Sequence, residues 1–255
     1  MTRIPRIAAA SLALLAAAPA FGTTYSTGSW STAADEGWKE VFTIAINDYS
    51  GTGNGDLSAC IPGSQAFRDR MYNAGWNNTR FYTDDDAWST DWESAGSDNS
   101  YADAADFGYV SAHGSSGAFY LNGNAGDNVV QASETRWGDS DLEVVSLDTC
   151  QTVDSAGRTA FISANLNRGV HFINGFQTNA LDITTTADKY GYYLAQGYTV
   201  RAAWVQATKD GHGSDRTAAY VRFYNSSCDT YDDKLSSLAC DPVSSSGYAT
   251  ATWSL

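Results

Sequence analysis

Short apolar runs alternate along the chain with stretches in which apolar residues recur at helical spacing. The runs 38–48 and 141–150 are rich in β-branched residues, which is typical of strands buried on both faces. In 61–76 the apolar positions follow a helical period, and Gly75 stands where a helix would end. The pattern predicts strands over 38–48, 79–83, 106–113, 118–123, 141–150, 169–176, 217–225 and 248–253, and helices over 61–76, 155–166, 187–197 and 200–211.

This order of elements indicates the fold class. Buried strands separated by helical segments favour an α/β fold with a mostly parallel central sheet and helices on both faces. Two stretches fall outside the pattern: 23–37 is polar and rich in Gly, Ser and Thr, and 84–105 is acidic and aromatic. We expect the first to be loosely ordered and the second to be a loop with one helical turn.

The first 20 residues have the character of a secretory signal peptide. Arg3 and Arg6 precede an apolar stretch over 7–18, and the small residues at 18 and 20 form a cleavage pattern. We therefore expect 1–20 to be removed, 21–37 to be flexible and 38–255 to form one domain that is secreted or periplasmic. No other segment has the roughly 18 apolar residues that a membrane span needs.

The composition narrows the range of partners. The chain has 29 acidic residues against 15 Lys and Arg, with a formal net charge of −14. An acidic surface repels nucleic-acid phosphates and anionic lipid, which argues against a nucleic-acid partner. The charge is also what keeps many exported proteins in solution. Nothing in the pattern indicates an oligomeric state.

Four cysteines lie beyond the predicted signal peptide. Export would permit disulfides, and Cys228 and Cys240 bracket a short polar loop, so we expect them to pair. Cys60 and Cys150 are then either paired with each other or free.

Two residue types with catalytic potential close predicted strands. His113 ends one apolar strand and is followed by Gly114, while Cys150 ends another. Loops converge at the carboxyl edge of an α/β sheet, and a histidine there can help a thiol to ionise. Each residue alone is also compatible with a plain role, His113 in a loop and Cys150 as a small buried apolar residue.

Three sequence blocks together resemble the metacaspase type of the caspase-like cysteine peptidase superfamily, which also includes the gingipains. These blocks are "INDYSGTGNGDLSAC", "DFGYVSAHGSSG" and "VVSLDTCQTVDSAG", and the resemblance covers roughly residues 40–160. It implies a caspase-like three-layer α/β fold and a cysteine endopeptidase. In this resemblance Cys150 matches the nucleophile and His113 the catalytic histidine, and the backbone N–H groups of Gly114 and Cys150 match the oxyanion hole.

The resemblance also implies an acidic pocket for a peptide or protein substrate with Arg or Lys before the scissile bond. Its parts fall on Asp148, Ser111 and Cys60. Taken on its own chemistry, Asp148 is equally compatible with capping nearby backbone N–H groups at the strand end.

The chain departs from the family pattern at three positions. Gly63 stands in place of a second pocket acid, Gln151 in place of the histidine after the nucleophile, and Ala112 in place of the glycine before the catalytic histidine. The alternative function is therefore an inactive, secreted binding domain on the same scaffold, with a Cys60–Cys150 disulfide.

The sequence indicates no required cofactor, although Ca²⁺ is a candidate because some metacaspases bind it through aspartates. Four acids have suitable chemistry: Asp127, Asp139, Asp141 and Asp154. A zinc site made of His113, His171 and Cys150 is not supported by any close ligand spacing. We expect His171 to lie in a core strand and His212 to be exposed to solvent.

Overall fold

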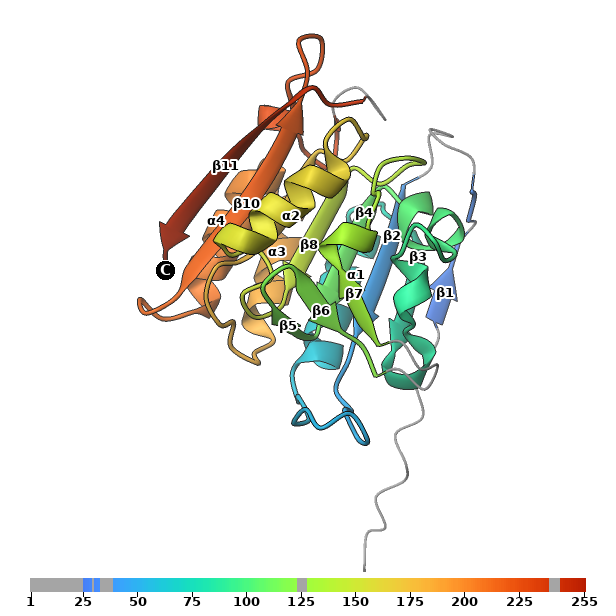
Figure 1. The fold of residues 1–255 in the computed structure, drawn as a ribbon, viewed down its shortest axis with the longest axis vertical. Coiled ribbons are helices and arrows are strands. Elements are labelled where there is room, and N and C mark those ends of the chain that lie inside the picture. Colours follow the sequence, from blue (N-terminus) through green and yellow to red (C-terminus); the bar gives the residue numbers. More distant parts are fainter. Residues whose placement is uncertain (1–24, 29, 33–38, 123–127, 239–243) are drawn as a thin grey trace, which may run out of the picture.

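The computed structural model describes residues 25–28, 30–32, 39–122, 128–238 and 244–255 (Figure 1). The predicted signal peptide, 1–20, lies outside the described residues.

A large sheet of eight strands forms the centre of the structure, with the spatial order β1-β3-β2-β4-β8-β9-β10-β11. Five neighbouring strands, β3, β2, β4, β8 and β9, are mutually parallel, whereas β1, β10 and β11 run antiparallel to their neighbours. The strands are β1 (Tyr25–Thr27), β2 (Glu40–Ala45), β3 (Asn78–Thr83), β4 (Phe107–Ser111), β8 (Val144–Asp148), β9 (Phe172–Phe176), β10 (Thr217–Tyr224) and β11 (Gly247–Ser254).

Helices cover both faces of this sheet (Figure 1). On one face, α1 (Cys60–Asn73), α3 (Thr185–Ala195) and α4 (Val200–Gly211) bury Phe67, Tyr190 and Trp204 against the strands. On the other face, α2 (Ser155–Asn165) packs through Phe161 beside Trp92 and Trp137. The predicted three-layer α/β fold with a mostly parallel sheet is confirmed.

The second face also carries smaller elements. Five short 3₁₀ helices lie there: η1 (Asp84–Asp86), η2 (Ser89–Asp91), η3 (Asp98–Ser100), η4 (Ala102–Ala104) and η5 (Ala132–Glu134). A sixth, η6 (Thr230–Asp232), lies beside α4, where Arg201 packs over the Tyr231 ring. The first four divide the stretch that the sequence suggested to be a loop. A small antiparallel sheet consists of β5 (His113–Ser115), β6 (Ala118–Tyr120) and β7 (Val129–Gln131).

The sequence pattern located the central elements but not all of their ends. The strand expected to end at His113 ends at Ser111, and His113 begins β5 of the small sheet instead. Part of the segment expected to be flexible, Tyr25–Thr27, forms β1 against β3. The helix over 200–211 begins and ends where the pattern placed it. None of the helices in the described part of the chain is long and apolar enough to span a membrane.

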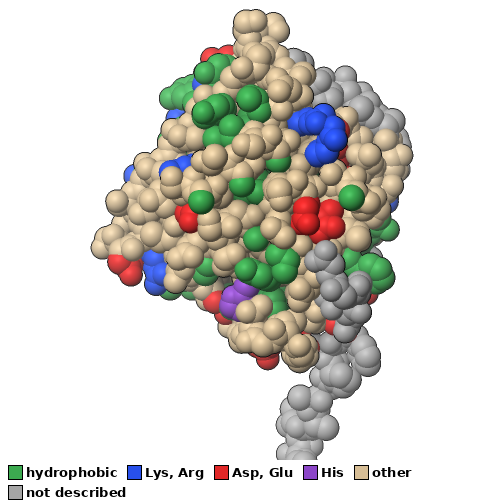
Figure 2. All heavy atoms as spheres, viewed as in Figure 1, with side chains coloured by type: hydrophobic (Ala, Val, Ile, Leu, Met, Phe, Trp, Pro, Cys, Tyr) green, Lys and Arg blue, Asp and Glu red, His purple; other side chains and the backbone are tan. Residues whose placement is uncertain are grey.

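Charged side chains are scattered over the face that carries α2 and the small sheet (Figure 2). Basic side chains form no continuous patch on the described part of this face, in keeping with a chain that has 29 acidic and 15 basic residues.

Candidate active site at the carboxyl edge of the sheet

The two sequence motifs meet at the carboxyl edge of the large sheet. β4 and β8 are adjacent parallel strands in which the last residues, Ser111 and Asp148, are paired in register. The backbone turns outward after each of these strands. His113 follows Ser111 by two residues, and Cys150 follows Asp148 by two residues. These four residues and Cys60 line one pocket of about 240 Å³, closed on its other side by the loop 180–183. The structure thus brings together the residues predicted for the dyad and the substrate pocket.

Asp148 lies at the buried end of this pocket. Its side chain accepts a hydrogen bond from the Tyr109 hydroxyl at 3.0 Å and is 7% exposed. Burial raises the pKa of Asp148 to about 7; the bond from Tyr109 lowers the pKa, and the charge of Asp182 raises it. A positively charged group in the pocket would stabilise the ionised carboxylate, because burial then costs less for a paired charge than for a lone one.

Cys150 is half-buried and carries a free thiol. Burial is the main reason that the pKa of the thiol is raised; the charge of Asp148 raises it further and that of Arg216 lowers it. The thiol donates a hydrogen bond to the Ala180 carbonyl oxygen, with Sγ and O 3.7 Å apart. The resting side chain is therefore the neutral thiol. A base must remove its proton before the sulfur can act as a strong nucleophile.

His113 is the base within reach of the same pocket, and its orientation is fixed. Its Nε2 lies 2.7 Å from the carbonyl oxygen of Gly55, which can only accept a hydrogen bond, so Nε2 carries a proton. In the neutral ring Nδ1 is then the unprotonated nitrogen. The backbone N–H of His113 donates to the Tyr49 hydroxyl at 2.8 Å, and the two rings pack with their centroids 4.6 Å apart.

Gly114 brings the histidine strand against the cysteine turn. A Cβ atom at this position would lie 2.5 Å from Thr152 Oγ1, 2.7 Å from the Cys150 carbonyl oxygen and 2.8 Å from Thr149 Cβ. No larger residue fits without a shift of this turn. The turn itself is held by a contact between the Thr149 and Thr152 hydroxyls and by a left-handed Gln151, with φ of 56°.

The sequence did not indicate Asp182, which is a second acid in the pocket. Its carboxylate accepts hydrogen bonds from Ser58 N at 2.6 Å, Ser58 Oγ at 3.0 Å and Ala59 N at 2.8 Å. These bonds tie the loop 180–183 to the start of α1. The only signal for it was an acid in the "NALDIT" loop that follows an apolar strand.

Gly63, where the family pattern would have a second pocket acid, faces a neighbouring helix. A Cβ here would lie 3.3 Å from the Cα of Thr184, which directly precedes α3, and 3.4 Å from the Cβ of Ala187 in the first turn of α3. The close packing of α1 on α3 leaves little room for a side chain at this position. The second acid of the pocket therefore comes from Asp182 on another segment.

The prediction that His212 is exposed is wrong. The side chain is buried, and its ring packs 4.6 Å from that of Phe176. Its Nδ1 accepts a hydrogen bond from Leu181 N at 3.3 Å, so Nε2 carries the proton and donates to Thr186 Oγ1 at 2.9 Å. Burial is the main reason that the pKa of His212 falls to about 4. Neutral His212 thus supports the pocket loop from behind.

His171 is buried as expected, but at the other end of the sheet. It directly precedes β9, with Nδ1 2.9 Å from the buried carboxylate of Asp233. The carboxyl edge holds His113 and Cys150, so the structure does not bring His171 to them, and these three residues form no zinc site.

The four aspartates considered for Ca²⁺ do not gather in one place among the described residues. Asp139 forms ion pairs with Arg136 and Arg168, at 3.1 and 2.7 Å. Asp154 caps α2, accepting a hydrogen bond from Gly157 N at 2.7 Å. Asp127 lies outside the described residues.

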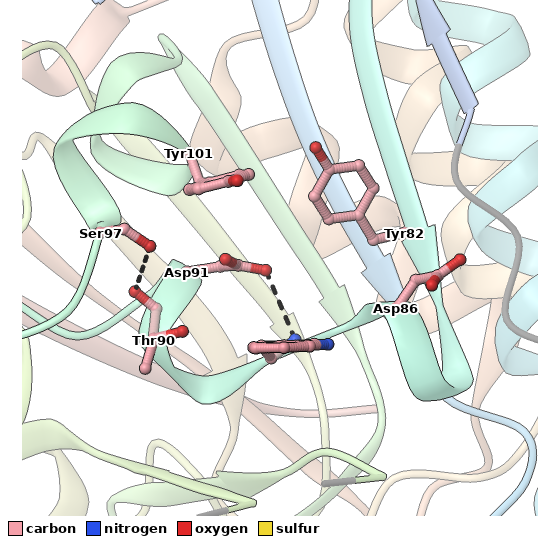
Figure 3. A pocket seen from close by; sticks show the side chains of 7 residues that line it. Tyr82, Asp86, Thr90, Asp91, Ser97 and Tyr101 are labelled. Carbon is pink, nitrogen blue, oxygen red and sulfur yellow. Dashed lines mark hydrogen bonds between the residues drawn. The ribbon is translucent and has the colours of Figure 1, made fainter. Parts of the chain in front are cut away.

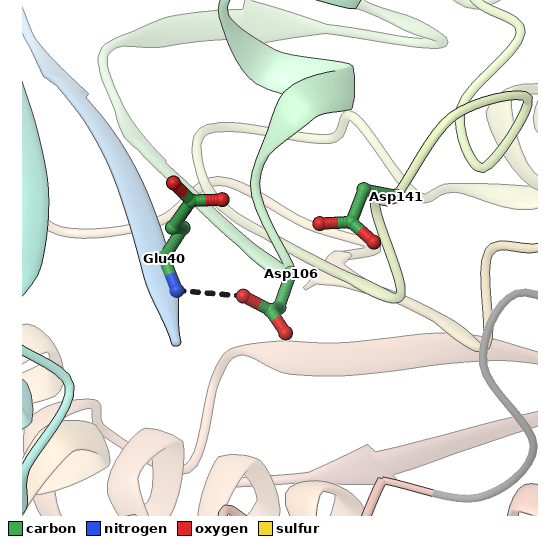
Figure 4. A group of neighbouring side chains, drawn as sticks. All are labelled: Glu40, Asp106 and Asp141. Atoms are coloured by element: carbon green, nitrogen blue, oxygen red, sulfur yellow. Dashed lines mark hydrogen bonds between the residues drawn. The ribbon is translucent and has the colours of Figure 1, made fainter. Parts of the chain in front are cut away.

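Asp141 belongs to a different acidic group, with Glu40 and Asp106 (Figure 4). Carboxylate oxygens of the three lie within 4.8 Å of one another, and all three side chains are buried. Glu40 N donates to Asp106 Oδ2 at 2.6 Å. Glu40 begins β2 and Asp106 precedes β4, so this group lies at the amino end of the parallel strands, opposite the pocket. Among the described residues, these are the carboxylates that could hold a cation.

The structure decides the disulfide state of two of the four cysteines. Cys60 and Cys150 are both free thiols, so the disulfide of the alternative function is not formed in this structure. Burial raises the pKa of Cys60, and a hydrogen bond with Ser111 lowers it. Cys228 is buried, but Cys240 lies outside the described residues, and their pairing stays a prediction.

The sequence matches the family model "Domain of unknown function (DUF6345)" over residues 43–254. The chain belongs to this family. The matched range contains every residue of the pocket, so the site lies wholly inside the DUF6345 domain. No curated protein matches the sequence.

Among solved structures, the DUF6345 domain is similar to a secreted C11 cysteine protease from Bacteroides thetaiotaomicron, determined in complex with an irreversible peptide inhibitor. The sequence identity is 8% and the TM-score 0.46; the match covers 72% of this chain and 66% of the protease, so this chain spans just under two thirds of that protein.

Proposed function

We propose that this protein is an exported cysteine endopeptidase of the caspase-like superfamily that cleaves after Arg or Lys. The observation that carries the proposal is a single pocket that holds a free thiol, an oriented histidine and two carboxylates: Cys150, His113, Asp148 and Asp182. The sequence resemblance assigns the same roles to the first three. Export rests on the signal-like segment at 1–20.

The arrangement supplies a base for the first step. With substrate bound, Nδ1 of His113 accepts the proton of the Cys150 thiol, and the sulfur attacks the carbonyl carbon of the scissile peptide. The Gly55 carbonyl holds Nε2 and so keeps the ring in the orientation and tautomer that leave Nδ1 free. Because the pKa of the thiol is raised, the proposed reaction needs His113 as a base to generate the nucleophilic sulfur.

The oxyanion formed by attack needs donors at fixed positions. The proposed donors are the backbone N–H groups of Gly114 and Cys150, on two turns that pack directly on each other. Collapse of this intermediate breaks the C–N bond, and the imidazolium of His113 gives its proton to the leaving amine. His113 then takes a proton from a water that attacks the thioester, which releases the acid product and restores the thiol.

Substrate choice follows from the two acids. A Lys or Arg side chain entering the pocket would place its charge beside Asp148, whose carboxylate otherwise has an elevated pKa, and near Asp182 on the loop. A charge-assisted hydrogen bond in this buried setting is stronger than one at the surface. Gly63 does not weaken this specificity, because Asp182 supplies the second acid.

Turnover of fluorogenic peptides by the purified protein tests the proposal. Peptides ending in Arg or Lys should be cleaved, peptides ending in Ala or Asp should not, and Cys150→Ala should abolish cleavage. In Cys60→Ala, which removes the other free thiol of the pocket, cleavage should persist, because Cys60 lines the substrate pocket and is not the proposed nucleophile. Absence of cleavage across pH, Ca²⁺ and reductant conditions would refute the peptidase and leave the inactive binding domain.

A further inference from the structure

A second and larger pocket, of about 400 Å³, lies in the segment that connects β3 to β4 (Figure 3). Three aromatic rings and two carboxylates line it: Tyr82, Trp88, Tyr101, Asp86 and Asp91. Figure 3 shows the Asp91 carboxylate and the rings of Tyr82 and Tyr101 around a common open space. Connections of this length without a long helix or strand are uncommon and often carry binding functions.

Two of the rings are fixed from behind by the core. Tyr82 packs edge-on against Phe42 with ring centroids 5.4 Å apart, and Tyr101 lies 6.2 Å from the same ring. The two tyrosines lie 5.9 Å from each other. Their positions are therefore set before any ligand arrives, which reduces the entropy lost on binding.

The third ring stands at the open side. Trp88 is 49% exposed, and its indole N–H donates to the Asp85 carbonyl at 2.9 Å. An indole held by its polar edge in this way keeps its face free for contact. The exposed face of Trp88 therefore borders the pocket and is accessible to a ligand.

Asp91 supplies a buried negative charge beside these rings. The residue is 6% exposed, and its Oδ2 accepts a long hydrogen bond of 3.4 Å from Trp88 N. Burial is the main reason that the pKa of Asp91 rises to about 7; this bond and the charge of Arg80 act against the rise. Arg80 itself lies over the Trp30 ring at 4.1 Å and donates to the Ser100 carbonyl at 2.8 Å.

We propose that this pocket binds an organic cation with an alkylated ammonium group, against the faces of Tyr82, Tyr101 and Trp88 and beside the carboxylate of Asp91. Aromatic faces attract such cations, most strongly where water is excluded. A neutral sugar would also stack on the rings, but it would gain neither the cation–π attraction nor an ion pair with Asp91. The pocket is separate from the proposed peptidase site, and the inference does not depend on that activity.

Calorimetric titration of the full-length mature protein with choline tests this. The control ligand is 3,3-dimethyl-1-butanol, which has the shape of choline without its charge. Choline should bind about tenfold more tightly or better, because only the cation gains the cation–π and carboxylate interactions. Trp88→Leu should weaken choline binding about tenfold, and Asp91→Asn should reduce the preference for choline over the alcohol, with the remainder supplied by the aromatic rings.

Tyr248→Leu is the matched variant, because Tyr248 is an aromatic residue of the same 49% exposure on β11, outside the pocket; it should leave choline binding unchanged. Trp88→Leu alters an exposed side chain, so the fold should persist, which near-ultraviolet circular dichroism checks. Titration with a peptide that contains trimethyllysine tests whether the pocket binds the alkylated ammonium group when it is part of a protein side chain.

Equal affinities for choline and the alcohol, or no binding of choline at millimolar concentration, would overturn the proposal. Binding of a disaccharide such as cellobiose that Trp88→Leu abolishes, with no response to choline, would do so as well.

Discussion

The two ends of the parallel strands place acidic side chains in very different surroundings. At the carboxyl end, Asp148 borders a 240 Å³ pocket that also contains a thiol and a histidine. At the amino end, Glu40, Asp106 and Asp141 are buried against one another. The carboxylates at both ends are buried, but only Asp148 has a pocket in front of it that can admit another molecule.

The difference arises from the connections. At the carboxyl end, the chain leaves β2 through the Gly-rich turn 50–57 and β4 through the small sheet, and the loop 180–183 stands across from them. The turn and the small sheet meet where His113 Nε2 lies 2.7 Å from the Gly55 carbonyl oxygen, whereas the loop 180–183 is bonded to the start of α1 and to His212. A cavity is left between these segments. At the amino end, Asp106 accepts a hydrogen bond directly from strand backbone, at Glu40 N. An acid predicted at a strand end can therefore be functional or structural, and the packing of the loops decides which.

The largest effect expected is on substrate choice at the carboxyl end. Asp148→Asn should lower kcat/KM for Arg-terminated peptides about 1,000-fold, because a buried charge of the substrate loses its partner. The folded-state pKa of Asp148 is raised to about 7, so the acid is neutral well below this pH and ionised above it. Binding of a small guanidinium compound such as agmatine to the Cys150→Ala protein should tighten as pH rises through about 7.

This pH dependence should vanish in the Cys150→Ala, Asp148→Asn double variant. Unchanged pH dependence in that protein would show that another group governs binding. The Cys150→Ala background removes turnover from the measurement.

The contact between the two catalytic turns gives the next effect. Gly114→Ala should lower kcat about 100-fold, because the new methyl group meets the Cys150 turn and displaces the histidine strand by a fraction of an ångström or more. Peptide kinetics and thermal unfolding measure it. Gly213→Ala is a control, since the only atom near its Cβ is a flexible side-chain oxygen of Asp215 at 3.3 Å; activity close to that of the unchanged protein is expected there.

The support of the pocket loop should have a smaller effect. His212→Gln removes the acceptor for Leu181 N and loosens the loop that carries Asp182. The loss of one hydrogen bond predicts a rise in KM of about fivefold with kcat nearly unchanged. A fall in kcat with constant KM would contradict this positioning role and assign His212 to the chemistry.

The amino end should show no effect on specificity. Asp106→Ala removes the acceptor of Glu40 N, which should lower the free energy of unfolding by about 1–3 kcal/mol. Denaturant unfolding measures this change. The ratio of kcat/KM for Arg and Ala peptides should stay as it was; a change in that ratio would mean that the two ends of the sheet are coupled.

Much of the fold was predictable because it rests on local periodicity. The buried run around Val144–Asp148 and the amphipathic helix Val200–Gly211 lie where the apolar pattern placed them. The end of β4 was misplaced because "SAHG" continues the apolar strand in sequence, whereas the chain bends after Ser111 into a second sheet. Nothing local distinguishes those two paths.

The side chains of the candidate site were also largely predictable from the sequence. His113, Cys150, Asp148, Ser111 and Cys60 were all indicated by motifs, and the structure places all five at one pocket. The Gly55 carbonyl was missed because a backbone acceptor has no side chain to reveal it. His212 was misjudged because its Gly-rich, charged neighbourhood is typical of an exposed loop.

By itself, the sequence determined which segments are buried, their type, and which reactive residues close the strands. These properties depend on the spacing of residues within a single helix or strand, so the sequence shows them directly. Only the tertiary structure decided that Asp182 is the second acid of the pocket, that His212 supports its loop, and that Glu40, Asp106 and Asp141 lie together. Each of these depends on contacts between segments far apart along the chain, which long-range packing sets and no local pattern encodes.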